Sequence, residues 1–572
     1  MRRLLIAGVT TGVFLGSVSA VAFAITNRYL TAGYPQLALM ACRGIVDRYT
    51  LGTVLVFSGI GLAVSLASRR LGVSVSGAYV SWLAERYVER LAGWLGQALG
   101  VLGNAKVAAA SLLLLAGVNA AAWRLADQGS RPRLNVLLIT VDALRADHLG
   151  AYGYPRPTSP HIDRLGREGV VFWRAVSQWP KTSPSFASML SSTYGHTNGL
   201  VRTTGQRLPD RLFTVAELLK AARFDTSAAV ANVNLGKVFN FHQGFDIYRE
   251  IWEEGEDDGS GTELVTRRGL ELLERGFHRR PFFLWLHYFD PHAPYEPPGA
   301  LDEMFVGDRY FDPARRAPLH TRKRRDLGGI PVQSRLGRED RIDYYVAQYD
   351  AEIRYVDEQI GILLRALEGL GLASNTLVIL TADHGESLGE HNYFFEHGRF
   401  PYDDCVRVPL ILRGPGTGTP GRLVRSPVEL IDVLPTVLEL AALPPSPDAE
   451  GKSLRPLLVG DRETGRRWTA FSESGYAENY QRSITSERYK LISVPDSEDR
   501  RVMQGRELEL YDLQEDPGEK RNLIDERPDV ARPLEKRLRR WMAGSRAGAR
   551  APEAVRIDPG TEERLRSLGY LD

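Results

Sequence analysis

The order of apolar and polar residues divides the chain into an apolar first part and a soluble remainder. Most of the first 125 residues are apolar with few acids, and the boundary lies near residues 128–133. Three apolar segments, 4–26, 51–67 and 106–123, come close to the roughly 20 residues that cross a bilayer core. They predict about three transmembrane helices. A cleaved signal peptide is the alternative for the first segment, because it has a basic start and an alanine-rich end.

Basic residues around these segments predict their orientation. Arg2 and Arg3 precede the first segment, and further arginines lie between the second and third, which favours both stretches on the cytoplasmic side. Three crossings would then leave everything after Trp123 outside the cytoplasm. Residues 79–98 carry apolar positions at helical spacing, which predicts an amphipathic helix at the membrane surface or, alternatively, one packed within the membrane. Residues 1–127 are therefore predicted to be a multi-pass region of the inner (cytoplasmic) membrane.

From residue 134 onward, short β-branched runs alternate with helical patterns. This alternation predicts an α/β fold with a mixed, mostly parallel central sheet that is sandwiched by helices. A long amphipathic pattern over residues 343–367 predicts a helix that covers the sheet. The predicted strands are Leu134–Val141, Thr226–Val230, Phe282–His287, Leu377–Thr381 and Val408–Leu412.

After residue 460 the pattern changes to short alternating stretches followed by a helical tail. Stretches at 468–471, 489–493 and 507–510 predict a small antiparallel sheet, and residues 528–542 predict a terminal helix. We therefore expect a main α/β domain over 133–460 and a C-terminal subdomain over 461–572.

Composition narrows the classes of function. Lys plus Arg (72) nearly balances Asp plus Glu (70), so the charge gives no reason to expect nucleic acid as a partner. The two cysteines, Cys42 and Cys405, have no metal-ligand spacing and indicate no disulfide framework. One basic run, residues 315–325, is typical of a solvated surface, with anionic lipid headgroups or an anionic substrate as the alternative partner.

Acids and imidazoles follow the predicted strands where the strands end. Ligands of such sheets gather at the carboxyl ends of strands, so these side chains are expected to meet in one site. Two carboxylates and one imidazole from separate strand ends suit one divalent cation with an open position. The residues in question are Asp142 after the first strand, His287, Asp290 and His292 at the third, and Asp383 and His384 after the fourth.

Five stretches taken together resemble the sulfatase family of the alkaline-phosphatase superfamily. They are NVLLITVDALRADHLG (135–150), KTSPSFASML (181–190), HYFDPHAPY (287–295), TADHGE (381–386) and EHG (396–398). The stretches RVPLILRGPG (407–416) and ELYDLQEDPGEKRNL (509–523) match as well, so the resemblance covers about residues 133–570.

The resemblance implies a metal-dependent ester hydrolase or transferase. It implies that Asp142, Asp383, His384 and Thr182 are the metal ligands, and that Thr182 is also the nucleophile. His292 and His397 are similar to the family histidines that hold substrate oxygens or protonate the leaving group. Glu386 and His391 are expected to lie around the metal ligands.

The window around Thr182 departs from the sulfatase pattern. Sulfatases have C-x-P-x-R, whose cysteine becomes a formylglycine, whereas this chain has Thr182 and Phe186 at those two positions. Pro184 at a first helical position, with Thr182 and Ser183 as capping residues, predicts a helix whose positive end faces the hydroxyl. A threonine ester cannot collapse to an aldehyde, which favours phosphoric over sulfuric esters.

The metal and several roles remain open in the sequence. Ala143 stands where many calcium-dependent sulfatases have another Asp, which with His384 favours manganese, zinc or magnesium over calcium. Lys181 is a candidate cation beside the ester, and His287 with Asp290 are candidates for a second metal or for the substrate. The expected substrate is an anionic ester such as a lipid headgroup or glycan. The alternatives are a sulfuric ester hydrolase without formylglycine and an inactive metal- or ligand-binding protein on the same scaffold.

Overall fold

The computed structural model describes residues 134–254, 261–275, 280–321, 327–460, 468–475, 480–495, 505–548 and 552–567. The chain divides into two units, Met1–Pro132 and Arg133–Asp572. The predicted membrane region, with its three segments and amphipathic helix, lies outside the described residues. Within the described ranges, no helix combines the length and apolarity that a bilayer crossing needs.

An eight-stranded sheet forms the centre of the second unit, in the order β13-β2-β12-β8-β1-β7-β5-β6. Its strands pair in parallel except β12, which is antiparallel to both β8 and β2. This is the mixed, mostly parallel sheet that the sequence predicts. The strands are β1 (Asn135–Val141), β2 (Val170–Phe172), β5 (Asp225–Val230), β6 (Ile247–Glu250), β7 (Phe282–Tyr288), β8 (Thr376–Ala382), β12 (Leu410–Arg413) and β13 (Arg422–Val424).

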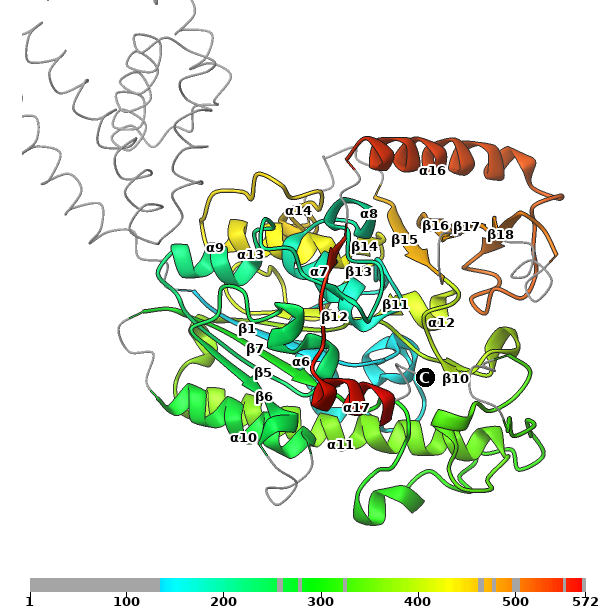
Figure 1. Cartoon of the computed structure of the whole chain (residues 1–572), viewed down its shortest axis with the longest axis horizontal. Helices are drawn as coiled ribbons and strands as arrows, with labels where there is room; N and C mark the ends of the chain where they lie inside the picture. The colour runs from blue at the N-terminus through cyan, green and yellow to red at the C-terminus, as the bar shows by residue number, and fades with distance from the viewer. Residues whose placement is uncertain are drawn as a thin grey trace, which may run out of the picture. The chain divides into compact units, whose positions relative to one another are not determined.

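Helices cover both faces of this sheet (Figure 1). On one face α11 packs against α6 and α10, and on the other α7 packs against α9 and α13. Strands β1, β7 and β8 are completely buried, as expected for central strands covered on both sides. The helices are α6 (Pro160–Glu168), α7 (Thr182–Ser191), α8 (Gly195–Asn198), α9 (Val215–Ala221), α10 (Gly261–Glu274), α11 (Ile342–Gly369), α12 (Asp403–Val406), α13 (Val433–Leu440) and α14 (Arg455–Val459).

A four-stranded antiparallel sheet, in the order β15-β16-β17-β18, forms the C-terminal part, and α16 packs on it (Figure 1). Its strands are β15 (Ala470–Ser474), β16 (Gln481–Thr485), β17 (Tyr489–Ser493) and β18 (Leu508–Asp512), and α16 spans Pro528–Gly548. The predicted small sheet and terminal helix are thus present. The division at residue 460 stays a prediction.

Short elements complete the described part of the chain. Among the 3-10 turns, η1 (Ala146–His148) follows β1 and η3 (Val233–Leu235) follows β5. Helix α17 (Pro559–Ser567) lies against η3. The minor strands are β3 (Ala175–Val176), β4 (Gln206–Arg207), β9 (Ser387–Leu388), β10 (Phe394–Glu396), β11 (Arg407–Val408), β14 (Val428–Glu429) and β19 (Glu553–Ala554).

Two local predictions are wrong. The strand expected over 408–412 is split at Pro409: β11 pairs with β3 in one sheet and β12 joins the central sheet. Proline has no N–H for a ladder, so the chain changes sheets there. Thr182 and Ser183 are not caps: α7 begins at Thr182, and Lys181 is the N-cap residue without a side-chain hydrogen bond. Pro184 is tolerated because the first turn of a helix has no partner for its N–H.

Candidate active site

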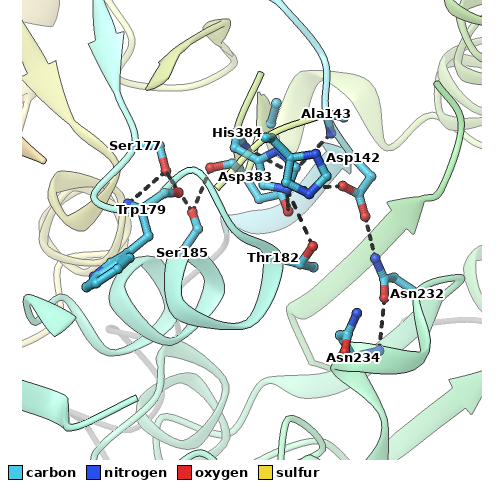
Figure 2. A network of polar contacts seen from close by, with 12 residues as sticks. Asp142, Ala143, Ser177, Trp179, Thr182, Ser185, Asn232, Asn234, Asp383 and His384 are labelled. Atoms are coloured by element: carbon cyan, nitrogen blue, oxygen red, sulfur yellow. Dashed lines mark hydrogen bonds and ion pairs between the residues drawn. The ribbon is translucent and has the colours of Figure 1, made fainter. Parts of the chain in front are cut away.

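Strands β1 and β8 bring together the two carboxylates and the imidazole that the sequence singles out. Asp142 directly follows β1, and Asp383 and His384 directly follow β8, the parallel neighbour of β1. One ligand atom of each residue lies within 4.8 Å of the others, and all three side chains are fully buried. Figure 2 shows the three side chains converging beside Thr182.

The orientation of His384 leaves its Nε2 atom as a bare acceptor. Its Nδ1–H donates to the carbonyl of Gly385 at 2.8 Å, which fixes the tautomer. Nε2 then lies 3.5 Å from Asp142 Oδ1, 3.3 Å from Asp383 Oδ2 and 3.4 Å from Thr182 Oγ1. The distances from Nε2 to these three oxygens are those expected between neighbouring ligands around one divalent cation.

The remaining hydrogen-bond capacity of these carboxylates supports a cation. Among the described residues, Asp142 Oδ1 and Asp383 Oδ2 are buried and have no hydrogen-bond partner. Burial and repulsion from Asp142 raise the pKa of Asp383 well above its ordinary value. Burial lowers the pKa of His384 well below its ordinary value, which keeps the imidazole neutral, as metal binding requires. A divalent cation would supply the positive charge that this donor set lacks, so the residues fit a metal ion.

One donor holds the other oxygen of Asp142, and an imidazole lies beside it. Asn232 Nδ2 donates to Asp142 Oδ2 at 2.6 Å, and His287 Nε2 lies 3.4 Å from the same oxygen. Burial opposes ionisation of Asp142, but the favourable interactions with His287 and the other nearby histidines outweigh it and lower the pKa of this carboxyl. On the far side of the His287 ring, Nδ1 lies 3.0 Å from the hydroxyl of Thr140. Oδ1 is thus left to face His384.

The side chain of Thr182 approaches the metal-ligand group from helix α7. It is the first residue of α7, so its hydroxyl lies at the positive end of a ten-residue helix. Ser185, one turn into the helix, donates from Oγ to the carbonyl of Asp383 at 2.7 Å. This bond ties the first turn of α7, which carries the Thr182 hydroxyl, to the metal-ligand group. Figure 2 shows the bond from Ser185 to Asp383 and the contact between Thr182 and His384.

His397 and His292 lie beside the group. The His397 ring stacks on His384 with centroids 4.0 Å apart, and its centroid is 5.0 Å from that of His292. His397 Nδ1 lies 3.1 Å from Glu386 Oε1. Burial raises the pKa of Glu386 to about 8 and lowers that of His397 to about 3. At neutral pH the His397 imidazole is therefore neutral, and the Glu386 carboxyl is largely protonated.

Three further candidates make contacts of their own. Lys181 donates from Nζ to the carbonyl of Gly475, at the end of β15, so it joins the site to the C-terminal sheet. Asp290 accepts a hydrogen bond from Thr262 at 2.6 Å. The group of three possible metal ligands found among the described residues does not include it. His391 stacks on Tyr402 at 3.5 Å between centroids.

Sequence reasoning missed Asn232. It follows β5, a predicted strand, by two residues, so the rule that ligands gather at the carboxyl ends of strands applies to it as it does to Asp142. An amide carries no charge and belongs to none of the quoted motifs, which is why the sequence alone did not single it out.

The doubly covered α/β sheet, the buried donor set that fits one divalent cation and the hydroxyl at a helix N-terminus are consistent with a hydrolase that acts on ester bonds. Residues 134–443 match the family model described as Sulfatase, and residues 389–545 match the one described as N-sulphoglucosamine sulphohydrolase, C-terminal. The chain belongs to the sulfatase family.

Curated relatives and solved structures agree with this membership. The N-acetylglucosamine-6-O-sulfatase of Bacteroides thetaiotaomicron is 24% identical, over 72% of this chain and 86% of the relative. The mouse (Mus musculus) iduronate 2-sulfatase is 28% identical, over 59% of this chain and 74% of the relative. A structure in complex with its substrate D-glucosamine-2-N,6-O-disulfate has a TM-score of 0.60 at 22% identity, covering 73% of this chain and 98% of that one. The phosphonate monoester hydrolase of Agrobacterium radiobacter has a TM-score of 0.58 at 21% identity, covering 74% and 100%.

Proposed function

We propose that this chain is a sulfuric ester hydrolase that works without formylglycine, with Thr182 as its nucleophile. The observation that carries the proposal is the convergence of Thr182 Oγ1 on the buried group formed by Asp142, Asp383 and His384. The relatives, which include sulfatases of N-acetylglucosamine, iduronate and ulvan, support sulfuric esters of sugars as the substrate class. The sequence by itself favoured phosphoric esters, and the relatives favour the sulfuric alternative.

In the proposed reaction, Thr182 attacks the ester, and the histidines transfer a proton and contact the substrate. A bound divalent cation supplies charge that lowers the pKa of a hydroxyl and offsets the anionic ester. After losing its proton to solvent, Thr182 Oγ1 attacks the central sulfur, forming a Thr182–O–S bond while the bond from sulfur to the leaving oxygen breaks. Glu386, which its raised pKa keeps largely protonated at neutral pH, passes its proton through His397 to the leaving oxygen, and His292 contacts the remaining ester oxygens. Water then releases sulfate, and its two protons restore the Thr182 hydroxyl and the Glu386 carboxyl.

Asp142, Asp383, His384 and Thr182 are the ligands in this proposal, and His287 acts with Asn232 as a support of Asp142. A neutral imidazole ligand favours manganese, zinc or magnesium, whereas the family resemblance leaves calcium open. Lys181 contributes positive charge from the rim of the site.

A phosphoric or phosphonic ester is the second candidate substrate. Thr182 stands where sulfatases have the cysteine that becomes formylglycine, and an ester of threonine cannot be released by collapse to an aldehyde. A phosphonate monoester hydrolase is among the similar structures, and the multifunctional alkaline phosphatase superfamily protein PehA of Trinickia caryophylli is 27% identical, over 57% of this chain and 77% of the relative.

A direct comparison of substrates tests the proposal. The full-length chain, purified in detergent and loaded with manganese, zinc, magnesium or calcium in turn, is assayed with 4-nitrophenyl sulfate, 4-nitrophenyl phosphate and bis(4-nitrophenyl) phosphate. We expect the highest kcat/KM for the sulfate and loss of turnover in Thr182→Ala. A preference for either phosphate would replace the lead candidate with the second. No turnover of any ester, with metal bound, would establish the inactive binding protein.

We propose further that residues 1–127 anchor the enzyme in the inner (cytoplasmic) membrane with the catalytic domain outside the cytoplasm. The support is the three apolar segments and the arginines that flank them. Fractionation of cells that express the full chain tests it, because recovery in the soluble fraction would contradict anchoring. Cleavage of the second unit by protease added to spheroplasts is the expected outcome.

A further inference from the structure

Asn234 stands out among the polar side chains around the site. It lies in η3, two residues after Asn232, and is completely buried. Among the described residues, neither its Nδ2 nor its Oδ1 has a hydrogen-bond partner. A buried carboxamide with both ends unpaired destabilises a folded protein, so such a group is retained for a partner that arrives from outside.

The backbone of Asn234 is fixed between the metal-ligand group and the nucleophile. Its N–H donates to Asn232 Oδ1 at 2.9 Å, and Asn232 in turn holds Asp142. Its carbonyl accepts a hydrogen bond from Ser183 Oγ at 3.1 Å, and Ser183 is the neighbour of Thr182. Figure 2 shows the carboxamide of Asn234 below Thr182 and beside Asn232. The backbone of Asn234 is thus tied both to the residue that holds Asp142 and to the neighbour of Thr182.

The chemistry of the two unpaired atoms defines the partner. Nδ2 donates and Oδ1 accepts, so a partner that is only an acceptor, such as an ester oxyanion, would leave Oδ1 buried and unpaired. A hydroxyl group both accepts and donates and satisfies the two atoms together. We propose that Asn234 binds a free hydroxyl adjacent to the scissile ester, which makes the substrate a monoester of a polyol or sugar with a neighbouring hydroxyl. This inference rests on the proposed ester hydrolysis.

Three aryl sulfates of graded chemistry test the pairing. Phenyl sulfate has no neighbouring hydroxyl, 2-hydroxyphenyl sulfate has one, and 2-methoxyphenyl sulfate has an oxygen that accepts but does not donate. In the wild type we expect kcat/KM for the hydroxyl compound to exceed that for the other two on the order of tenfold. In Asn234→Leu, which keeps the volume but removes both polar ends, this ratio is expected to fall to about one.

Thermal unfolding separates binding from a structural role. We expect the Tm of Asn234→Leu to equal or exceed that of the wild type, because the removed amide has no partner in the folded state. Asn198→Leu is the matched control: Asn198 is equally buried, but its amide bonds to Thr193 and Leu200, so its Tm should fall while the substrate ratio holds.

Each other outcome overturns the inference in a recognisable way. A wild type that hydrolyses 4-nitrophenyl sulfate but does not prefer the hydroxyl compound would refute the hydroxyl partner and leave the proposed function standing. An equal fall in kcat/KM for all three aryl sulfates in Asn234→Leu would mean that the amide binds the ester oxygens instead. A fall in Tm like that of Asn198→Leu, with the ratio kept, would make Asn234 structural. Absence of turnover with every ester would remove the proposed function and this inference together.

Discussion

Removal of the metal should lower thermal stability by an amount that the buried donor set determines. Asp142 and Asp383 face each other without a compensating charge, and a cation that binds only the folded state stabilises it by about 2.7 kcal/mol at a concentration 100 times its dissociation constant. Unfolding entropy is about 2.1 cal/mol/K per residue, so the unit Arg133–Asp572 should gain ~3 °C in Tm on saturation.

The assay is differential scanning fluorimetry of the full-length chain after chelation, with each divalent cation then added back. Asp383→Ala should abolish the response to metal, because it removes one of the two carboxylates that bind the cation. The shift should also shrink as the pH falls, because the raised pKa of Asp383 lets protons compete with the cation.

A second buried aspartate provides the control for this experiment. Asp357 accepts the backbone N–H groups of His161 and Ile162 and lies outside the metal-ligand group. Asp357→Ala should lower the baseline Tm and keep the full response to metal. An equal response in Asp383→Ala and the wild type would refute the reasoning, because the cation would then bind elsewhere.

The remaining predictions concern two lysines. Lys490 is fully buried between Asp403 and Glu519, at 2.9 Å from each, so Lys490→Met should lose about 3–5 kcal/mol of stability in urea unfolding. An unchanged midpoint would contradict this. Burial and the nearby Arg202 lower the pKa of Lys181 to about 8, so kcat/KM for an anionic ester should fall as the pH rises above about 8, and Lys181→Met should lack that limb. Because the pKa of Lys181 is lower in the folded protein than in the unfolded chain, Lys181 binds fewer protons in the folded protein between about pH 8 and pH 10.5. The stability of the wild type should therefore rise with pH across this range, and that of Lys181→Met should not.

The central strands could be predicted from sequence because they are continuous apolar runs. The runs at 134–141, 282–287 and 377–381 correspond to β1, β7 and β8 within one residue at each end. The amphipathic run at 343–367 lies within α11 (Ile342–Gly369) for the same reason. Burial on two faces leaves little choice of residue, so the pattern is strong.

Edge and C-terminal strands gave weaker patterns. β16 (Gln481–Thr485) was missed because four of its five residues are polar. Its Ser483 and Thr485 are nevertheless buried, so tertiary packing rather than hydrophobic pattern places this strand. The three-residue strands β2 and β13 are too short for any period to be read.

The candidate site, too, could be predicted only in part from the sequence. Asp142, Asp383 and His384 were predictable because acidic and imidazole side chains directly after apolar runs are unusual. The roles of Asn232 and Asn234 depend on which atoms lack partners, and this follows only from coordinates.

The most direct test of the central claim is intact-mass analysis of the acid-quenched enzyme during turnover of 4-nitrophenyl sulfate. The wild type should carry one sulfuryl group, mapped to the peptide that contains Thr182, or one phosphoryl group when a phosphoric ester is the better substrate. Thr182→Ala should carry none. Two results would contradict the account. One is turnover by the wild type without an adduct when the adduct forms faster than it is hydrolysed, and the other is an adduct of equal yield in Thr182→Ala.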